Sequence, residues 1–154
     1  TPWAIATDGT GNVYVADYDV GVRKVTPDGA VTTLAKPANV TFTPSDVTVD
    51  ASGNVYAINE DDTLLYRIGT DAAVVHFAGT EKPGVADGPR STSRFGSYLT
   101  GLTFDSRGYV VFADRNNGTI RQVSTAPGTL PALRVAPRAA EPKATRAAGF
   151  KFKR

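Results

Sequence analysis

Apolar and polar residues alternate along much of this chain, in short runs separated by turn-forming residues. In residues 7–17, an Asp ends one apolar run, small or polar residues and a Gly follow, and a second alternating run begins. Asp, Asn and Gly favour tight turns, and alternating β-branched and aromatic residues favour strands. This stretch therefore predicts two antiparallel strands joined by a tight turn.

The same unit returns at residues 49–59 and, in a degraded form, at residues 104–114. Asp8, Asp50 and Asp105 mark equivalent positions, 42 and 55 residues apart, and each is followed by a Gly at the same spacing. A period in the forties is typical of a four-stranded propeller blade. The chain is therefore predicted to be all-β, with blades of four antiparallel strands.

The extra length between the second and third units predicts an inserted loop at residues 79–100, where no hydrophobic period is sustained. The fourth strand of the third blade could come only from residues 130–135, where a proline restricts it to a sheet edge. Within a repeat region of residues 1–136, the three blades are predicted at about 2–36, 44–79 and 100–136.

Composition agrees with a soluble globular chain, since 41% of the 154 residues are hydrophobic and 21% are charged. No apolar run approaches the roughly 18–20 residues that a membrane helix needs, so no membrane span is predicted. The lack of Cys excludes disulfides and thiolate chemistry. The chain also lacks Met and opens directly in a predicted strand, which we interpret as a processed product or a fragment.

Charge is distributed unevenly along the chain. Residues 138–154 carry a net charge of +5, and the rest of the chain carries −3. We therefore predict a basic flexible tail at residues 137–154, and nucleic acid is not an expected partner of the acidic folded part. Anion or nucleic-acid binding through the tail is a separate possibility.

Alternating aromatic and basic residues near the end of the tail could add a strand to a partner's sheet, or could belong to a disordered basic end. These tail-contact residues are Phe150, Lys151, Phe152 and Lys153.

A longer motif lies within residues 2–35. It reads Pro-x-x-Ile-Ala-x-Asp-x-x-Gly-Asn-Val-Tyr-Val-Ala-Asp and then Val-Arg-Lys-Val-x-Pro-Asp-Gly-x-Val-Thr-Thr-Leu-Ala. This motif resembles the NHL repeat, and residues 44–78 and 101–123 carry it in turn. The spacer motifs Ala78-Gly79-Thr80, Ala86-Asp87-Gly88 and Arg94-Phe95 are also similar to the long spacer of bacterial NHL arrays. The resemblance covers about four-fifths of the chain. It implies blades of a β-propeller, usually six in this family.

Three blades cannot close a ring, and an open stack leaves sheet edges and apolar faces exposed. The chain could be half of a larger array, pair with a second copy in a six-bladed ring, or be completed by a different protein. The resemblance thus implies protein–protein binding and assembly as an oligomer. Together with the abundance of Thr and the missing start, it also implies an extracytoplasmic location, secreted or periplasmic.

In an antiparallel four-stranded blade, the loops after the second and fourth strands emerge at the same end. The predicted turns at residues 17–21, 59–63 and 114–118 therefore share one face with the inserted loop. Propellers of this family generally bind partners on one such face. The alternative is that these are ordinary polar turns, and that the lone Trp is a packing residue. The side chains predicted to contact a partner are Trp3, Tyr18, Glu60, Asp61, Arg94, Arg115 and Asn116.

Two further sets of residues recur in the repeats and predict structural contacts. An Arg on the third strand of each repeat, at Arg23, Arg67 and Arg121, predicts inter-blade ion pairs. The expected acidic partners are Asp8, Asp50 and Asp105. Polar residues that follow each second strand are expected to accept hydrogen bonds from backbone N–H groups of the turn. These residues are Asp17, Asn59 and Asp114.

The sequence contains few residues of the kinds that catalysis requires. His76 is the only histidine and falls on a predicted outermost strand. Related propeller lyases and hydrolases hold a metal with several His and acidic residues, which this chain alone cannot supply. It also has no Ser–His–Asp arrangement and no phosphate-cradling loop. We therefore expect no catalytic residue, no metal and no cofactor. The alternative is a propeller lyase or lactonase whose metal site lies in missing blades.

Overall fold

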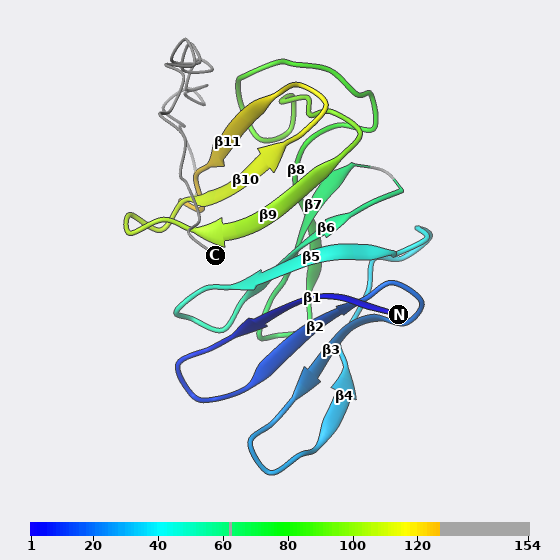
Figure 1. Ribbon diagram of the computed structural model, residues 1–154, viewed down its shortest axis with the longest axis vertical. Helices are drawn as coiled ribbons and strands as arrows, with labels where there is room; N and C mark the ends of the chain where they lie inside the picture. Colours follow the sequence, from blue (N-terminus) through cyan, green and yellow to red (C-terminus); the bar gives the residue numbers. More distant parts are fainter. Residues whose placement is uncertain (62, 127–154) are drawn as a thin grey trace, which may run out of the picture.

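The computed structural model describes residues 1–61 and 63–126, which form three antiparallel sheets without a helix (Figure 1). Blade 1 contains β1 (Pro2–Thr7), β2 (Val13–Asp17), β3 (Gly21–Val25) and β4 (Val31–Thr33). Blade 2 contains β5 (Pro44–Val49), β6 (Val55–Asn59), β7 (Leu64–Ile68) and β8 (Val74–Ala78). Blade 3 contains β9 (Leu99–Phe104), β10 (Val110–Asp114) and β11 (Thr119–Val123).

The recurring Asp organises the first hairpin of each blade. In blade 2, Asp50 Oδ1 accepts hydrogen bonds from the backbone N–H groups of Ser52 (2.9 Å) and Asn54 (2.8 Å). Its Oδ2 accepts a third from the Asn54 side-chain amide at 2.8 Å. Gly53 completes the turn at a φ of 84°, a conformation that suits glycine. Asp8 and Asp105 accept equivalent backbone bonds, so one local motif is used three times.

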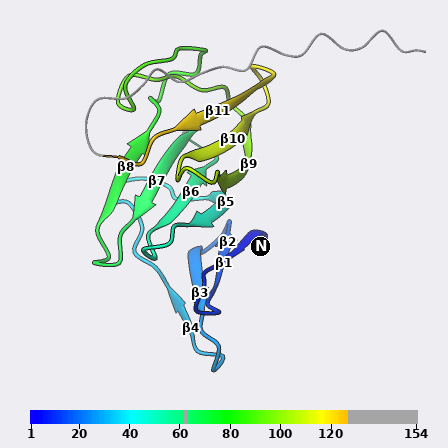
Figure 2. The same ribbon diagram turned by 90° about the vertical axis from the view of Figure 1, so that its left-hand side faces the viewer.

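The first strands of the blades lie side by side, β1 against β5 and β5 against β9, and they run in the same direction (Figure 1). The remaining strands of each blade follow in sequence order away from this inner row. Figure 2 shows the three sheets stacked one after another. This arrangement confirms an all-β, β-propeller architecture.

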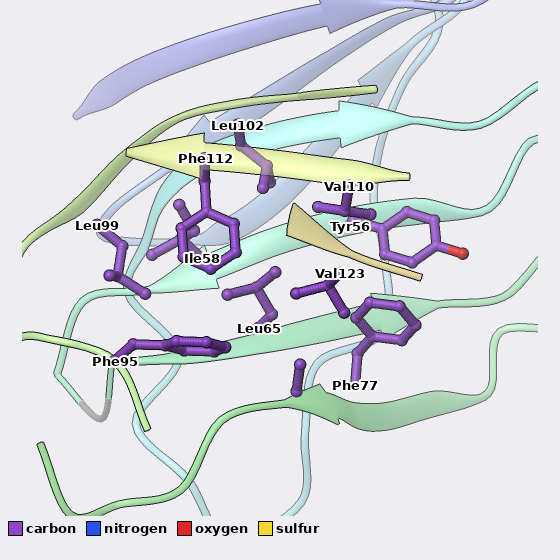
Figure 3. Packing of buried hydrophobic residues seen from close by; sticks show 11 residues of the cluster. Tyr56, Ile58, Leu65, Phe77, Phe95, Leu99, Leu102, Val110, Phe112 and Val123 are labelled. Carbon is purple, nitrogen blue, oxygen red and sulfur yellow. The ribbon is translucent and has the colours of Figure 1, made fainter. Parts of the chain in front are cut away.

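Two apolar cores lie between the three blades, and β6 contributes to both. Alternate side chains of a strand point to opposite faces. Val55 and Ala57 accordingly pack toward blade 1, with Tyr14, Ala16 and Val22. Tyr56 and Ile58 pack toward blade 3, where Leu65 and Phe77 meet Leu102, Val110, Phe112 and Val123 (Figure 3). Blade 2 is therefore buried on both faces, which explains why every residue of β6 is buried.

The insertion between blades 2 and 3, here named the connector (residues 79–98), has only one isolated strand-like pairing, between Ala86 and Arg94. Residues 79–98 otherwise form a loop, and β9 begins at Leu99, one residue before the predicted start of the third blade. The predicted fourth strand of blade 3, the boundary at residue 136 and the tail lie outside the described residues. Within the described ranges, no helix is long and apolar enough to span a membrane.

The prediction for the recurring arginines is wrong in two respects. Arg23 pairs across the sheet with Val15, and Arg121 pairs with Phe112, so both occupy one structural position. In blade 2 that position belongs to Tyr66, which pairs with Ala57, and Arg67 lies one residue further along. Loop length does not account for this shift, because the β6–β7 loop (residues 60–63) and the β10–β11 loop (residues 115–118) are equally long. Arg67 lies one position later on its own strand.

The ion-pair partner also differs from the prediction. Arg121 contacts Asp87 of the connector at 3.2 Å, and not a hairpin aspartate. Arg67 donates to Asn54 within its own blade, at 2.6 Å. Asp105, one of the expected partners, instead accepts from Arg107 and Gln122 of blade 3. Arg121 therefore fixes the connector, and Arg67 fixes the β5–β6 hairpin. Asp8, Asp50 and Asp105 instead stabilise their own turns.

Candidate functional site

A polar residue at the end of each second strand ties the blade to the segment that precedes its inner strand. Asn59 Oδ1 accepts from Thr43 N at 2.7 Å, and Asp17 Oδ1 accepts from Thr1 N at 2.8 Å. The hydrogen bond from the Thr1 amino group also lowers the pKa of the Asp17 carboxyl. The predicted bonds to the turn itself are present for Asp17, which accepts from Asp19 N at 3.3 Å.

In blade 3, both carboxylate oxygens of Asp114 accept from Gly96 N at 3.1 Å. A side chain at position 96 would place its Cβ 2.5 Å from Asp114 Oδ1, so glycine allows this close approach. Asp114 also accepts from Asn117 N of the turn, at 3.4 Å. Asn117 in turn donates to Gly84 O at 2.8 Å. These bonds fix the connector against blade 3 and thereby fix the residues that lead into β9.

A cavity of about 310 Å³ opens where the inner strands of the three blades begin. We name this side of the molecule the loop face, because the β2–β3, β6–β7 and β10–β11 loops and the connector lie there. The cavity is bounded by residues of all three blades and of the connector. Its lining consists of Trp3, Ser45, Ile58, Asn59, Glu60, Thr63, Ser97, Tyr98, Leu99, Thr100 and Arg115.

Three of the residues predicted to contact a partner line this cavity: Trp3, Glu60 and Arg115. A fourth, Tyr18, stacks on the Trp3 indole with a ring-centroid distance of 5.1 Å and an interplanar angle of 16°. The loop face predicted from strand order therefore does gather side chains from different blades. Their role in binding stays a prediction.

The other predicted contact residues do not line the cavity. Arg94 is fixed within the connector, where it donates to Lys82 O at 3.2 Å and to Pro83 O at 2.8 Å. Asp61 and Asn116 are exposed residues of the β6–β7 and β10–β11 loops. The tail-contact residues Phe150, Lys151, Phe152 and Lys153 lie outside the described part of the chain.

Residues that the sequence prediction missed include Tyr98, Ser97 and Thr63. Tyr98 O accepts from Arg115 N at 2.9 Å, as Thr43 O accepts from Glu60 N at 3.2 Å in blade 2. Tyr98 thus occupies the position directly before the inner strand, like Thr43. This equivalence could have been found by aligning the repeats one residue further upstream. Thr63 gave no sequence signal, because its role depends on backbone conformation.

Polar atoms in the cavity wall lack protein partners. Glu60 Oε2 and Ser45 Oγ are both buried and make no hydrogen bond. Buried polar atoms are normally paired, so these two oxygens are available to a water molecule or to a ligand. Thr63 adds a second unusual feature, a φ of 57° that is strained for a β-branched residue. The equivalent position in blade 3 is Gly118, with a φ of 61°.

The described residues bring no metal-binding constellation together. Within residues 1–61 and 63–126, no group of three or more His, Cys, Asp and Glu side chains could hold a metal ion. His76 lies on β8, the outer strand of blade 2, as the sequence predicts. Its ring is 6.0 Å from the ring of Tyr66, and it does not line the cavity. The lining residues of the cavity supply hydrogen-bonding groups and aromatic surface.

Sequence comparison identifies no relative, because no protein-family model and no curated protein sequence matches the chain. Structural comparison does find similar folds. A protein of unknown function from Bacteroides thetaiotaomicron superposes with a TM-score of 0.71 at 20% identity, covering 87% of this chain and 35% of that one. Virginiamycin B lyase from Staphylococcus aureus gives a TM-score of 0.62 at 18% identity, covering 87% of this chain and 40% of the lyase.

An auxiliary nutrient binding protein from Bacteroides thetaiotaomicron gives a TM-score of 0.66 at 14% identity, over 86% of this chain and 35% of that protein. At these identities the likeness shows the fold alone, and that fold is the β-propeller. The chain spans less than half the length of each of these structures. The NHL assignment within the propellers stays a resemblance.

Proposed function

We propose that this chain is a non-catalytic β-propeller module for binding and assembly, whose ring is completed by further blades or by a second copy. Protein–protein contact through its blade faces is the central element of the proposal. The loop face, with Trp3, Glu60 and Arg115 at its cavity, is the second binding surface. The propeller fold and the presence of binding proteins among the similar structures support this proposal.

The observation that carries the proposal is a difference in burial between equivalent residues. Ile5 of β1 occupies the position of Val47 in β5, yet 69% of Ile5 is exposed and only 2% of Val47. At the other end of the stack, Ile120 of β11 is 54% exposed, whereas its equivalent Leu65 is fully buried. Positions that are core in the internal interfaces are thus exposed apolar surface on the two terminal blades. Such surface favours association.

Arg23 lies on the same face of blade 1 as Ile5, the face on which the described residues place no neighbouring blade, and its charge would favour an acidic partner. Its structural equivalent, Arg121, is buried and pairs with Asp87 of the preceding connector. Arg23 has a buried Nε without a hydrogen-bond partner. A neighbouring blade that arrives with an acidic connector would pair with this guanidinium. Blade 1 therefore repeats both the apolar and the ionic parts of the interface seen between blades 2 and 3.

Light scattering on the purified chain tests the assembly proposal. We expect a mass of at least twice the monomer value of 16.2 kDa. Ile5→Lys and Ile120→Lys, which place a charge on either open face, should each lower that mass toward the monomer. Val85→Lys is the matched control, because Val85 is an exposed apolar residue of the connector. A compact monomer for the unmodified chain would contradict the proposal.

A second candidate function is part of a propeller lyase whose metal site is completed by other blades. The fold similarity to virginiamycin B lyase favours considering it. The test is elemental analysis of the purified protein together with incubation with virginiamycin B. A bound metal and a cleaved product would favour the lyase. For either function we propose an extracytoplasmic location, secreted or periplasmic.

A further inference from the structure

We infer that the loop-face cavity binds a small neutral sugar. The inference rests on the proposed binding role of this face and names the ligand class. Five of its lining residues carry hydroxyl groups, and the lining includes one carboxylate and one guanidinium. Its volume of about 310 Å³ is at the lower end of the range for small-molecule sites. The hydroxyl-bearing residues are Ser45, Thr63, Ser97, Tyr98 and Thr100.

The charges of the lining select against an ionic ligand. Glu60 and Arg115 both line the cavity, and they bring opposite charges to it. A cation attracted by Glu60 would meet the positive charge of Arg115, and an anion attracted by Arg115 would meet Glu60. A neutral ligand with many hydrogen-bonding groups avoids both repulsions. A zwitterion could match both charges, so it is the competing ligand class in the test.

The two unpaired polar atoms specify what that ligand must offer. Glu60 Oε2 can only accept a hydrogen bond while the carboxyl is ionised, and Ser45 Oγ can donate or accept. Neither oxygen is exposed in the free protein, so this contact requires the Glu60 and Ser45 side chains to turn toward the cavity. Neighbouring hydroxyl groups of a sugar can then donate to the carboxylate and accept from the serine at the same time. A bond from a hydroxyl to a carboxylate is charge-assisted, and it is stronger than a neutral one.

The cavity also presents aromatic surface on which a sugar ring can pack. Trp3 from blade 1 and Tyr98 beside blade 3 both line it, and more than half of the surface of each residue is exposed. Tyr18 stacks on the indole and restricts its orientation. The C–H face of a sugar ring packs well on an aromatic face, which is itself large, apolar and slightly negative. Sugar hydroxyls would then point to the polar wall while the ring contacts the aromatic residues.

The chain supplies its own reporter for this site, because Trp3 is its single tryptophan. The test is a titration of the full chain with maltose, cellobiose and lactose at millimolar concentrations, followed by tryptophan fluorescence. We expect a saturable change in Trp3 emission with at least one of these neutral disaccharides. The zwitterion alanine should give none. No saturable change with any disaccharide, or a response to alanine alone, would overturn the inference.

Variants connect the signal to the cavity. Glu60→Gln removes the charged acceptor and should weaken sugar binding about tenfold, and Ser45→Ala should weaken it by a smaller factor. Asp61→Asn is the matched control, because Asp61 neighbours Glu60 but does not line the cavity. Circular dichroism checks that each variant is folded. If Glu60→Gln, Ser45→Ala and the control bind the disaccharide with equal affinity, the inference is also contradicted. Assembly is measured separately by light scattering, so failure of ring completion and failure of sugar binding are distinguishable.

Discussion

Asp87 lies 3.2 Å from Arg121, a guanidinium that is fully buried against the connector. The same guanidinium donates to Ala86 O at 3.0 Å and lies over the Phe95 ring at 5.2 Å. A buried charge without its counter-charge is costly. This pair therefore makes the connector part of the folded structure of blade 3.

We predict that Asp87→Asn lowers the free energy of unfolding by about 1–2 kcal/mol, less than for a fully buried pair because Asp87 is partly exposed. Urea denaturation followed by circular dichroism measures this. Glu81→Gln is the control, since Glu81 is an exposed acidic residue of the same connector. Its effect should stay within about 0.5 kcal/mol. Equal losses in both variants would show that the Arg121 pair has no special role.

The hairpin aspartates give a second prediction. Asp50→Ala removes four hydrogen bonds: two from backbone N–H groups, one from the Asn54 side chain and one from the Tyr56 hydroxyl. We expect a loss of about 1–2 kcal/mol in the free energy of unfolding. Asp71→Ala removes one backbone bond, from Ala73 N, in the β7–β8 turn. It should cost less than half as much, and a comparable cost would contradict the importance of the first hairpin.

Acid should weaken the fold through the equivalent residue of blade 1. The hydrogen bond from the Asn12 side chain, supported by bonds from Thr10, holds the pKa of Asp8 well below its ordinary value. A depressed pKa in the folded state contributes stability above the unfolded pKa of about 3.9. That contribution is lost as the pH falls from there toward the folded pKa.

Urea midpoints at about pH 6 and about pH 3 test this prediction. The unmodified chain should lose stability between them. Asp8→Asn, which cannot be protonated at this position, should start less stable and lose less. Other carboxyls with lowered pKa values, including Asp28 and Asp105, contribute to acid sensitivity in both proteins. An identical pH dependence in both proteins would exclude a role for Asp8.

Substitution of Thr63 is expected to raise the free energy of unfolding, whereas the preceding substitutions lower it. Its φ of 57° is strained for threonine, and glycine adopts such a value freely. We expect Thr63→Gly to raise the free energy of unfolding by about 1 kcal/mol, the relief of strain exceeding the entropy cost of glycine. The reverse exchange is the matched control. At Gly118, an added Cβ meets nothing within 4 Å, so Gly118→Thr should cost about 1 kcal/mol through backbone strain alone. Destabilisation by Thr63→Gly would contradict the prediction.

The sequence predicts the blades well because each is specified locally. The hairpin around Asp50 needs only the Asp, the Gly and the alternation that follows, all within about ten residues. The position of Trp3 and Glu60 on one face follows from strand order alone. Strand register is harder to predict. Aligning the three arginines pairs Arg67 with Arg23 and Arg121, whereas the observed register places Tyr66 at that position.

The connector shows a second limit. Its residues have no period, so nothing in their pattern pairs Asp87 with a strand that comes 34 residues later. Such a contact is decided by tertiary packing, in which Phe95 fills the space between blades 2 and 3. The cavity is likewise visible only when Glu60, Ser45 and Thr63 are seen together in space.

The bonds from Thr43 to Asn59 and from Gly96 to Asp114 have a consequence for how such chains arise. Each joins the segment before an inner strand to the blade that follows it. The self-contained structural unit is therefore a blade together with its preceding loop. A gene rearrangement that cuts just after the fourth strand, as at Ala78, would carry each loop with the residue that anchors it. Insertions such as the connector could then lengthen between copies without separating a blade from its own anchor.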